Sequence, residues 1–418
     1  MRCTMKRSEW DDRKVYLEKL VLNYIKLNRE IDDEELQLAI SEVVNKESKK
    51  QYFSLELRNQ LIKDLFDSLR RLDVITDLID NHEITEIMVN GPGDIYIEKE
   101  GLLMKTEKAF SSKRKLEDII QKIASNVNRR VNEANPIVDA RLSDGSRVNI
   151  VLEPVALNGP VVTIRRFPEE PLTMNQLIQM EAITREAAEF LKNLVVSGYN
   201  IFISGGTGSG KTTFLSALTG YIPENERVIT IEDSSELRLP WIKNLVQLET
   251  REANVEGNNE ITIRQLIKTA LRMRPDRIIV GEIRSSEAID MLMAMNTGHD
   301  GSLSTGHANS PIDMIARIET MVLMGMDIPL QAIRRQIASA IDIIIHLGRL
   351  RDKSRKVLSI CEVAGIRNGE VDLNCLYYFK EEKQEGGNEK QYGKIRGSLV
   401  RTDKNLLHKE KLQFTGLQ

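Results

Sequence analysis

A glycine-rich segment between an apolar run and a helical pattern constrains this chain more than any other stretch. Residues 201–203 have the composition of a short buried strand, and apolar residues recur at helical spacing over 214–218. Between them, Gly205 to Thr212 follow the pattern G-x-x-x-x-G-K-[ST]. A strand, a glycine loop and a helix in this order are the context that a phosphate-binding loop needs.

The residues of this loop have distinct expected roles. Glycines let successive backbone N–H groups point at one anion, and the following helix adds the positive end of its dipole. We expect Lys211 to reach the β- and γ-phosphates of ATP and the Thr212 hydroxyl to hold Mg²⁺. A glycine turn with a solvated lysine is the alternative, but it leaves the flanking strand and helix unexplained. The predicted nucleotide contacts are Gly205, Gly206, Thr207, Gly208, Ser209, Gly210, Lys211, Thr212 and Thr213.

Changes in local composition and in hydrophobic periodicity divide the 418 residues into parts. Residues 1–75 are charged, with apolar residues at helical spacing, and predict a helical extension that is either a plain bundle or a docking segment. Residues 76–167 combine strand patterns, a helix and a hairpin turn, and predict a small α/β domain. Two prolines make 168–172 a stiff linker. We assign 173–380 to a nucleotide-binding domain and 381–418 to a C-terminal tail.

Three more apolar runs in the second half end in reactive side chains. Residues 228–231 lead into an acidic stretch, 277–280 into Gly-Glu, and 302–305 into Gly-His. Buried strands that alternate with helices predict a parallel sheet, with one helix over 177–194 before it and a further strand over 341–347. Ligands bind beyond the carboxyl ends of such strands, so these ends mark one site.

The carboxylates at these strand ends suggest chemistry on a nucleotide phosphate. We expect Glu282 to act as the base or to orient the attacking water, with Glu236 as the next candidate. Glu232 and Asp233 are assigned to the metal shell, because Gly281 stands where the second nucleotide motif usually carries its acid. Each of these acids has a plainer interpretation, as a helix N-cap or a solvated turn.

Histidine and arginine side chains complete the candidate site. His307 is suited to sensing the γ-phosphate or bonding Glu282, unless its own turn satisfies it. Arginines stabilise the charge of a phosphoryl transition state, and a neighbouring subunit can supply them. Arg141, Arg147 and Arg165 lie on the predicted hairpin and a nearby strand, where ordinary exposed arginines are the alternative.

Composition argues against several classes of protein. A net charge of −3 argues against bulk binding of nucleic acid. No apolar run reaches the ~18 residues of a membrane span and the polar N-terminus is no signal peptide, so we expect any membrane role to be peripheral. Cys3, Cys361 and Cys375 lack the spacing of a metal or redox motif, and we expect reduced thiols in a cytosolic protein.

Together, these motifs resemble those of secretion ATPases of the type II/type IV superfamily. The matching stretches are the phosphate loop 205–212, an acidic box at 231–237, the second motif at 278–282 and a histidine box at 301–308. Residues 271–277 and 295–301 are most similar to the CpaF-like branch, which drives assembly of tight-adherence pili, and 163–167 and 393–397 fit that branch too. The resemblance covers about residues 75–418.

The resemblance implies a RecA-like motor domain and a hexameric ring that binds ATP between the N-terminal and motor domains. It also implies work at the cytoplasmic face of the inner membrane, on an integral platform protein. Family arginines that reach the nucleotide map onto Arg141, Arg147 and Arg165 or Arg166. The chain has no Cys-x-x-Cys pair, so no zinc subdomain is expected.

The sequence therefore predicts a hexameric P-loop ATPase that powers pilus assembly or protein secretion. A type IV secretion or conjugation ATPase that moves protein or DNA is the alternative within the superfamily. A RecA-type DNA-dependent ATPase is opposed by the mild acidity and the histidine box. A nucleotide-binding scaffold without turnover is opposed by the intact Lys211 and Glu282.

Overall fold

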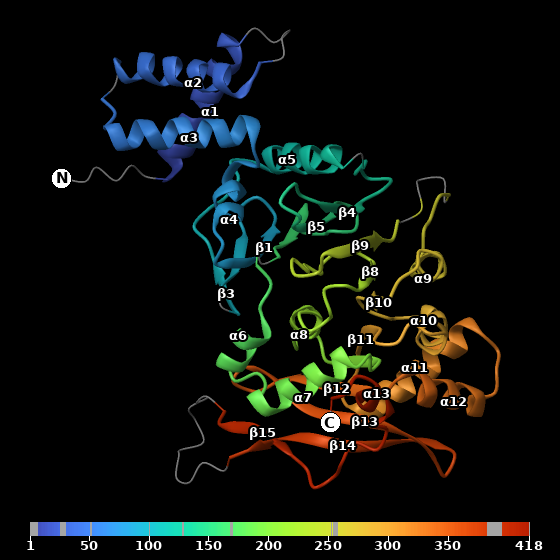
Figure 1. Cartoon of the computed structure of the whole chain (residues 1–418). Helices are drawn as coiled ribbons and strands as arrows, with labels where there is room; N and C mark the ends of the chain where they lie inside the picture. The colour runs from blue at the N-terminus through green and yellow to red at the C-terminus, as the bar shows by residue number, and fades with distance from the viewer. Residues whose placement is uncertain are drawn as a thin grey trace. The chain divides into compact units, whose positions relative to one another are not determined.

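The computed structural model describes residues 7–25, 31–50, 52–99, 101–127, 129–167, 170–251, 253, 258–382 and 395–417. The chain forms two compact units, residues 1–169 and 170–418, and each is described by itself (Figure 1). Cys3, Pro168 and Gly393, which entered the predictions above, lie outside the described residues.

The first unit begins with a helical bundle, as the apolar spacing predicts. Its helices are α1 (Arg7–Tyr24), α2 (Asp33–Ser48) and α3 (Leu55–Arg70). Asp32 and Ser54 cap the second and third helices by accepting backbone N–H groups three residues on. The buried side chains include Leu17, Val21, Ile40, Leu61 and Leu65.

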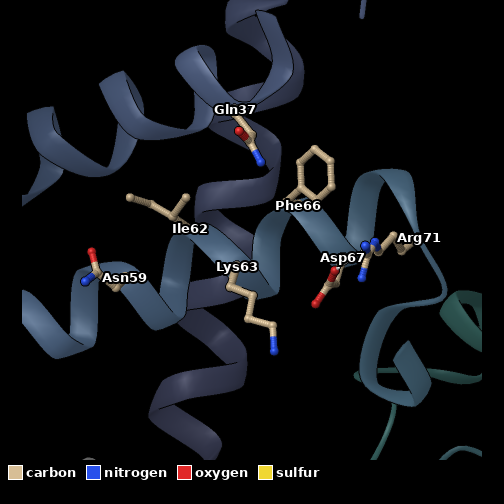
Figure 2. Close-up of a pocket in the computed structure, with 7 residues that line it drawn as sticks. All are labelled: Gln37, Asn59, Ile62, Lys63, Phe66, Asp67 and Arg71. Carbon is tan, nitrogen blue, oxygen red and sulfur yellow. Dashed lines mark ion pairs between the residues drawn. The ribbon is translucent and has the colours of Figure 1, made fainter. Parts of the chain in front are cut away.

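A cavity of about 420 Å³ lies on this bundle, along α3. Figure 2 shows its lining: Gln37, Asn59, Ile62, Lys63, Phe66, Asp67 and Arg71. Its two cations already pair with carboxylates, Lys63 with Asp77 at 2.5 Å and Arg71 with Asp80 at 3.1 Å. Because it is lined by none of the residues with predicted nucleotide chemistry, this cavity is not the candidate site.

The rest of the first unit is an antiparallel sheet with one long helix. Its short helices are η1 (Asp73–Ile75) and α4 (Thr76–Asp80), and its long helix is α5 (Lys113–Asn126). The strands are β1 (Ile84–Asn90), β2 (Ile95–Lys99), β3 (Leu102–Lys105), β4 (Ile137–Arg141), β5 (Arg147–Val151) and β6 (Val161–Arg165). Among the described residues their order is β3-β2-β1-β6-β5-β4. The predicted hairpin between 141 and 147 is therefore confirmed as β4–β5.

The second unit is built on one large sheet of order β15-β14-β13-β12-β7-β11-β10-β8-β9 in the described residues (Figure 1). Its strands are β7 (Ile201–Gly205), β8 (Arg227–Glu232), β9 (Asn244–Glu249), β10 (Arg277–Val280), β11 (Leu303–His307), β12 (Ile343–Arg349), β13 (Arg355–Arg367), β14 (Glu370–Glu381) and β15 (Gly397–Arg401). The strands from β7 to β12 pair in parallel, as predicted. Beyond this predicted parallel part, β13, β14 and β15 extend the sheet by antiparallel pairing, β13 with β12, β14 with β13 and β15 with β14.

Helices cover both faces of this sheet. They are α6 (Met174–Gln179), α7 (Arg185–Val196), α8 (Lys211–Thr219), α9 (Ile263–Ala270), α10 (Glu287–Asn296), α11 (Pro311–Gly325), α12 (Leu330–Ala340) and α13 (Glu410–Phe414). Ile201 and Ile203 of β7 pack into one apolar cluster and Phe202 into the other. This alternation shows that β7 is buried on both faces.

Two expectations for the second unit need correction. The single helix over 177–194 is instead α6 and α7, because Glu181 adopts a φ of 58° and Thr184 starts α7 as its N-cap. The described part of the predicted tail is packed rather than separate, since β15 pairs with β14 and both Leu399 and Leu406 are buried in the core.

None of the helices in the described residues combines the length and the apolar character needed to cross a bilayer.

Candidate nucleotide-binding site

The phosphate loop connects the buried strand β7 to α8. Gly208 and Gly210 adopt φ angles of 69° and 92°, in the left-handed region that favours glycine. At Gly205 a Cβ atom would lie only 2.5 Å from the carbonyl oxygen of Leu347. These positions therefore require glycine for the conformation and packing of the loop, independently of any ligand.

Lys211 and two side chains from other strand ends form a row beside this loop. The Nζ atom of the buried Lys211 donates to the carbonyl oxygens of Gly205 and Gly206, both at 3.2 Å, and lies 3.2 Å from His307 Nδ1. His307 ends β11, the parallel neighbour of β7. Its Nε2 atom lies 2.8 Å from Oε1 of Glu282. The structure thus brings the predicted phosphate ligand, sensor and base together.

The environment of His307 favours a neutral imidazole. Burial lowers the pKa of His307, the charge of Lys211 lowers it further, and Glu282 opposes both. Burial also lowers the pKa of Lys211, with Glu282 acting in the opposite direction. A neutral ring that accepts a hydrogen bond from the ammonium group at Nδ1 carries its own proton on Nε2, on the side of Glu282.

Glu282 also contacts a guanidinium group. Arg284 Nη2 donates to Glu282 Oε2 at 2.7 Å, and Nη1 lies 3.6 Å from Asp233 Oδ2. The hydrogen bond that Arg284 donates to Glu282 raises the pKa of Arg284. Glu282 therefore lies between an imidazole and a guanidinium, and the hydrogen bond from Arg284 fixes the position of Oε2, while Oε1 is close to His307 Nε2 but accepts no hydrogen bond within the described residues.

Glu232 faces inward instead of toward a metal site. Only 4% of the residue is exposed, and its Oε1 atom accepts the N–H groups of Glu236 at 3.0 Å and Leu237 at 3.1 Å. A Cβ at Gly281 would lie 2.8 Å from Glu232 Cγ, so the glycine leaves the space that this side chain occupies. We therefore reassign Glu232 from the metal shell to holding the acidic box in place.

Replacing Glu232 by glutamine should remove a pH-dependent loss of stability. Burial raises the pKa of Glu232 to about 7 from 4.5, while the N–H groups of Glu236 and Leu237 oppose this shift. As pH rises from about 4.5 to about 7, the unfolded chain releases this proton before the folded protein does, so wild-type stability falls. We expect the free energy of unfolding of Glu232→Gln, measured relative to wild type, to be roughly 3 kcal/mol higher at pH of about 8 than at pH of about 4.5.

Denaturant unfolding of both proteins at the two pH values measures this difference. Glu189→Gln, which changes an exposed carboxylate in α7, is the matched control and should show no such gain. An equal stability difference at both pH values would contradict the buried-acid assignment.

The remaining metal-shell candidates are placed where solvent or a ligand can reach them. Asp233 is exposed, and Thr212 and Glu236 are half-buried. Among the residues that the structure describes, no group of three or more His, Cys, Asp or Glu side chains could hold a metal by itself. The hydroxyl of Thr212 and the carboxylate of Asp233 suit Mg²⁺ that is bound mainly by nucleotide phosphates and water.

The three predicted arginines of the first unit lie side by side. Arg141 pairs in register with Arg147, and Arg147 with Arg165, so they form a row across β4, β5 and β6. Arg166 instead donates to the backbone oxygens of Asn81 and Ile84. The row is thus formed by Arg165 and not by Arg166, and its action on a nucleotide stays a prediction.

No sequence pattern predicted two arginines that the structure brings to the phosphate loop. Arg349 ends β12 and Arg355 begins β13, and Arg355 Nε donates to the carbonyl oxygen of Gly208 at 2.9 Å. The sequence around them predicts only a charged turn, and Arg355 lies 147 positions after Gly208 in the chain.

This chain is similar to several known proteins. Residues 69–396 match the family model of type II/IV secretion system proteins. The chain is 34% identical over 303 residues to a putative conjugal transfer protein of Mycobacterium tuberculosis, a match that covers 71% of this chain and 85% of that protein. It is 31% identical to the type IV secretion system protein VirB11 of Brucella suis, with 66% and 84% covered.

A solved structure shares the fold. The pilus retraction motor PilT with bound ADP superposes with a TM-score of 0.52 at 20% identity, covering 83% of this chain and 88% of that one. At this identity the likeness concerns the fold alone.

Proposed function

Because this chain belongs to the type II/IV secretion system protein family, we propose that it is a P-loop ATPase with a RecA-like motor, which hydrolyses ATP to ADP and phosphate. The observation that carries the proposal is the row Lys211, His307 and Glu282 at the ends of neighbouring parallel strands. It combines a phosphate ligand, a neutral imidazole and a carboxylate beside a glycine loop, as phosphoryl transfer to water requires.

Each group has a role that follows from its contacts. On nucleotide binding, Lys211 exchanges the carbonyl oxygens of its own loop for the β- and γ-phosphates. This movement leaves His307 Nδ1 without its ammonium donor, so the hydrogen bonding of the ring changes when nucleotide binds. Glu282, fixed by Arg284 and His307, orients the attacking water. Thr212 and Asp233 would hold Mg²⁺, which would supply positive charge against the phosphates.

We further propose that the work done is transfer of protein or DNA through a type IV secretion or conjugation apparatus. Support comes from the relatives named above, and from the conjugal transfer protein TrbB of Rhizobium radiobacter, which is 30% identical over 312 residues. Assembly of a tight-adherence pilus, which the motifs at 271–277 and 295–301 favour, is the second candidate. Neighbouring genes for a coupling protein would support transfer, and genes for prepilins would support the pilus.

The proposed assembly is a homohexamer that binds peripherally at the cytoplasmic face of a membrane, on an integral platform protein. The row of arginines in the first unit supports a shared site, because it gathers positive charge on a unit that holds no phosphate loop. In this proposal a neighbouring subunit supplies Arg141, Arg147 and Arg165 to the nucleotide.

ATP turnover measured over a series of protein concentrations, with the mass of the particle measured in parallel, tests the proposal. We expect specific activity to rise as hexamers form, because an interfacial site is complete only in the ring. Full activity of the monomer would contradict the shared site and the arginine roles. Absence of turnover at every concentration, with nucleotide still bound, would favour a scaffold instead.

A further inference from the structure

The turn that joins β12 to β13 lies beside the phosphate loop. β12 is the parallel neighbour of β7, and Leu347 pairs in register with Gly205 at the start of the loop. The chain then turns and returns as β13, with Arg349 opposite Arg355. We call residues 349–355 the arginine hairpin.

Arg355 holds the loop by its backbone. Its Nε atom donates to the carbonyl oxygen of Gly208 at 2.9 Å. Its Cδ atom lies 3.4 Å from the position that a Cβ at Gly210 would take. The Arg355 side chain therefore packs along Gly208 and Gly210, the two left-handed residues whose conformation sets the shape of the loop.

Arg349 brings a second guanidinium to the same place. Its Nη1 atom lies 3.9 Å from where a Cβ at Gly208 would be. In the part of the chain that the structure describes, neither Arg349 nor Arg355 has a carboxylate partner. Both side chains thus approach Gly208, and two guanidinium groups at one place repel one another unless an anion lies between them.

The hairpin is built as a rigid element. The N–H of Leu350 donates to the oxygen of Ser354 at 2.8 Å. Asp352 accepts the N–H of Ser354 at 3.0 Å and that of Ile395 at 2.7 Å, which ties the turn to the segment that leads into β15. Arg351, the remaining arginine of the hairpin, pairs with Glu381 of β14 instead.

We propose that the arginine hairpin binds nucleotide phosphates in cis, with Arg349 as a phosphate ligand and Arg355 as the residue that positions the loop. The ligand class is a nucleoside di- or triphosphate. The inference rests on the proposed function, because the anion is the one that the phosphate loop cradles. It adds a source of positive charge from the same subunit, distinct from the arginine row of the first unit.

Equilibrium binding to the full-length protein tests the assignment, with ADP and inorganic pyrophosphate as probes. Arg349→Ala should raise the Kd for both probes about tenfold, the effect of losing one charge-assisted hydrogen bond. Arg349→Lys should lose less, since it keeps the charge without the planar fork. Arg351→Ala is the matched control from the same hairpin and should bind like wild type.

The outcomes separate the possible failures. A Kd of Arg349→Ala within twofold of wild type for both probes would overturn the phosphate role. A loss confined to ADP would overturn it as well, because it would place Arg349 on the nucleoside. If wild-type protein bound neither probe, the proposed function itself would fail and the hairpin assignment with it. Thermal unfolding without ligand should show that every variant is folded.

A separate measurement, of KM and kcat, tests Arg355 as a positioning residue. Arg355→Ala should raise the KM for ATP and the Kd for ADP together while kcat changes less, because the loop binds more weakly but Glu282 and His307 stay in place. Loss of kcat with unchanged KM would contradict a positioning role at the loop.

Discussion

Replacement of Lys211 by alanine should abolish nucleotide binding. The variant removes the one cation that the loop motif itself supplies to the phosphates, so two charge-assisted hydrogen bonds are lost. We expect the Kd for ADP and ATP to rise at least about 100-fold. Calorimetric titration of the full-length protein with each nucleotide measures the change.

Unfolding of the unliganded variant separates this effect from misfolding. Burial lowers the pKa of Lys211, which means that keeping this charge in the folded protein reduces the free energy of unfolding. Without nucleotide, Lys211→Ala should therefore unfold at the wild-type temperature or slightly above it. Lys243→Ala, which removes an exposed lysine paired with Glu224, should bind nucleotide normally. Near-normal affinity in a folded Lys211→Ala protein would refute the phosphate assignment.

Glu282→Gln should bind ATP with wild-type affinity and lose turnover. The amide keeps the shape of the side chain and its contact with His307, but it no longer accepts a proton from water. A positioned general base contributes about 10² to 10⁴ in rate, so kcat should fall by at least about 100-fold. Phosphate release under saturating ATP gives kcat, and titration with ADP gives the affinity.

Glu236→Gln serves as the comparison, because Glu236 is the next candidate base and the backbone N–H that it donates to Glu232 is kept in the variant. Turnover close to wild type in Glu282→Gln, together with loss of turnover in Glu236→Gln, would identify Glu236 as the general base. Loss of turnover in both would assign Glu236 a role in the metal shell or the water network as well.

Local sequence was sufficient to predict the centre of the site. The motif from Gly205 to Lys211 specifies its own geometry, because its glycines, strand and helix are contiguous. Glu282 and His307 could be placed near it because parallel strands deliver their carboxyl ends to one edge. In the structure Lys211 lies 3.2 Å from His307, and His307 lies 2.8 Å from Glu282, while their roles stay a prediction.

Features that depend on packing could not be predicted in this way. The direction of the Glu232 carboxylate depends on the empty space at Gly281, which follows the neighbouring strand β10. The arginine hairpin meets the loop only because β12 pairs with β7, a contact between distant segments. The break between α6 and α7 depends on one residue, Glu181, in a conformation that its type rarely adopts.

The close approach of β12 to the loop has a consequence for the timing of the reaction cycle. Gly205 lies against Leu347, and Arg355 is bonded to Gly208, so the loop reaches its binding shape when the protein folds. The conformational entropy of ordering it is then lost in folding and not in association. Under the proposed function, nucleotide would meet a preformed receptor, and we expect product release or movements elsewhere in the protein to limit the rate.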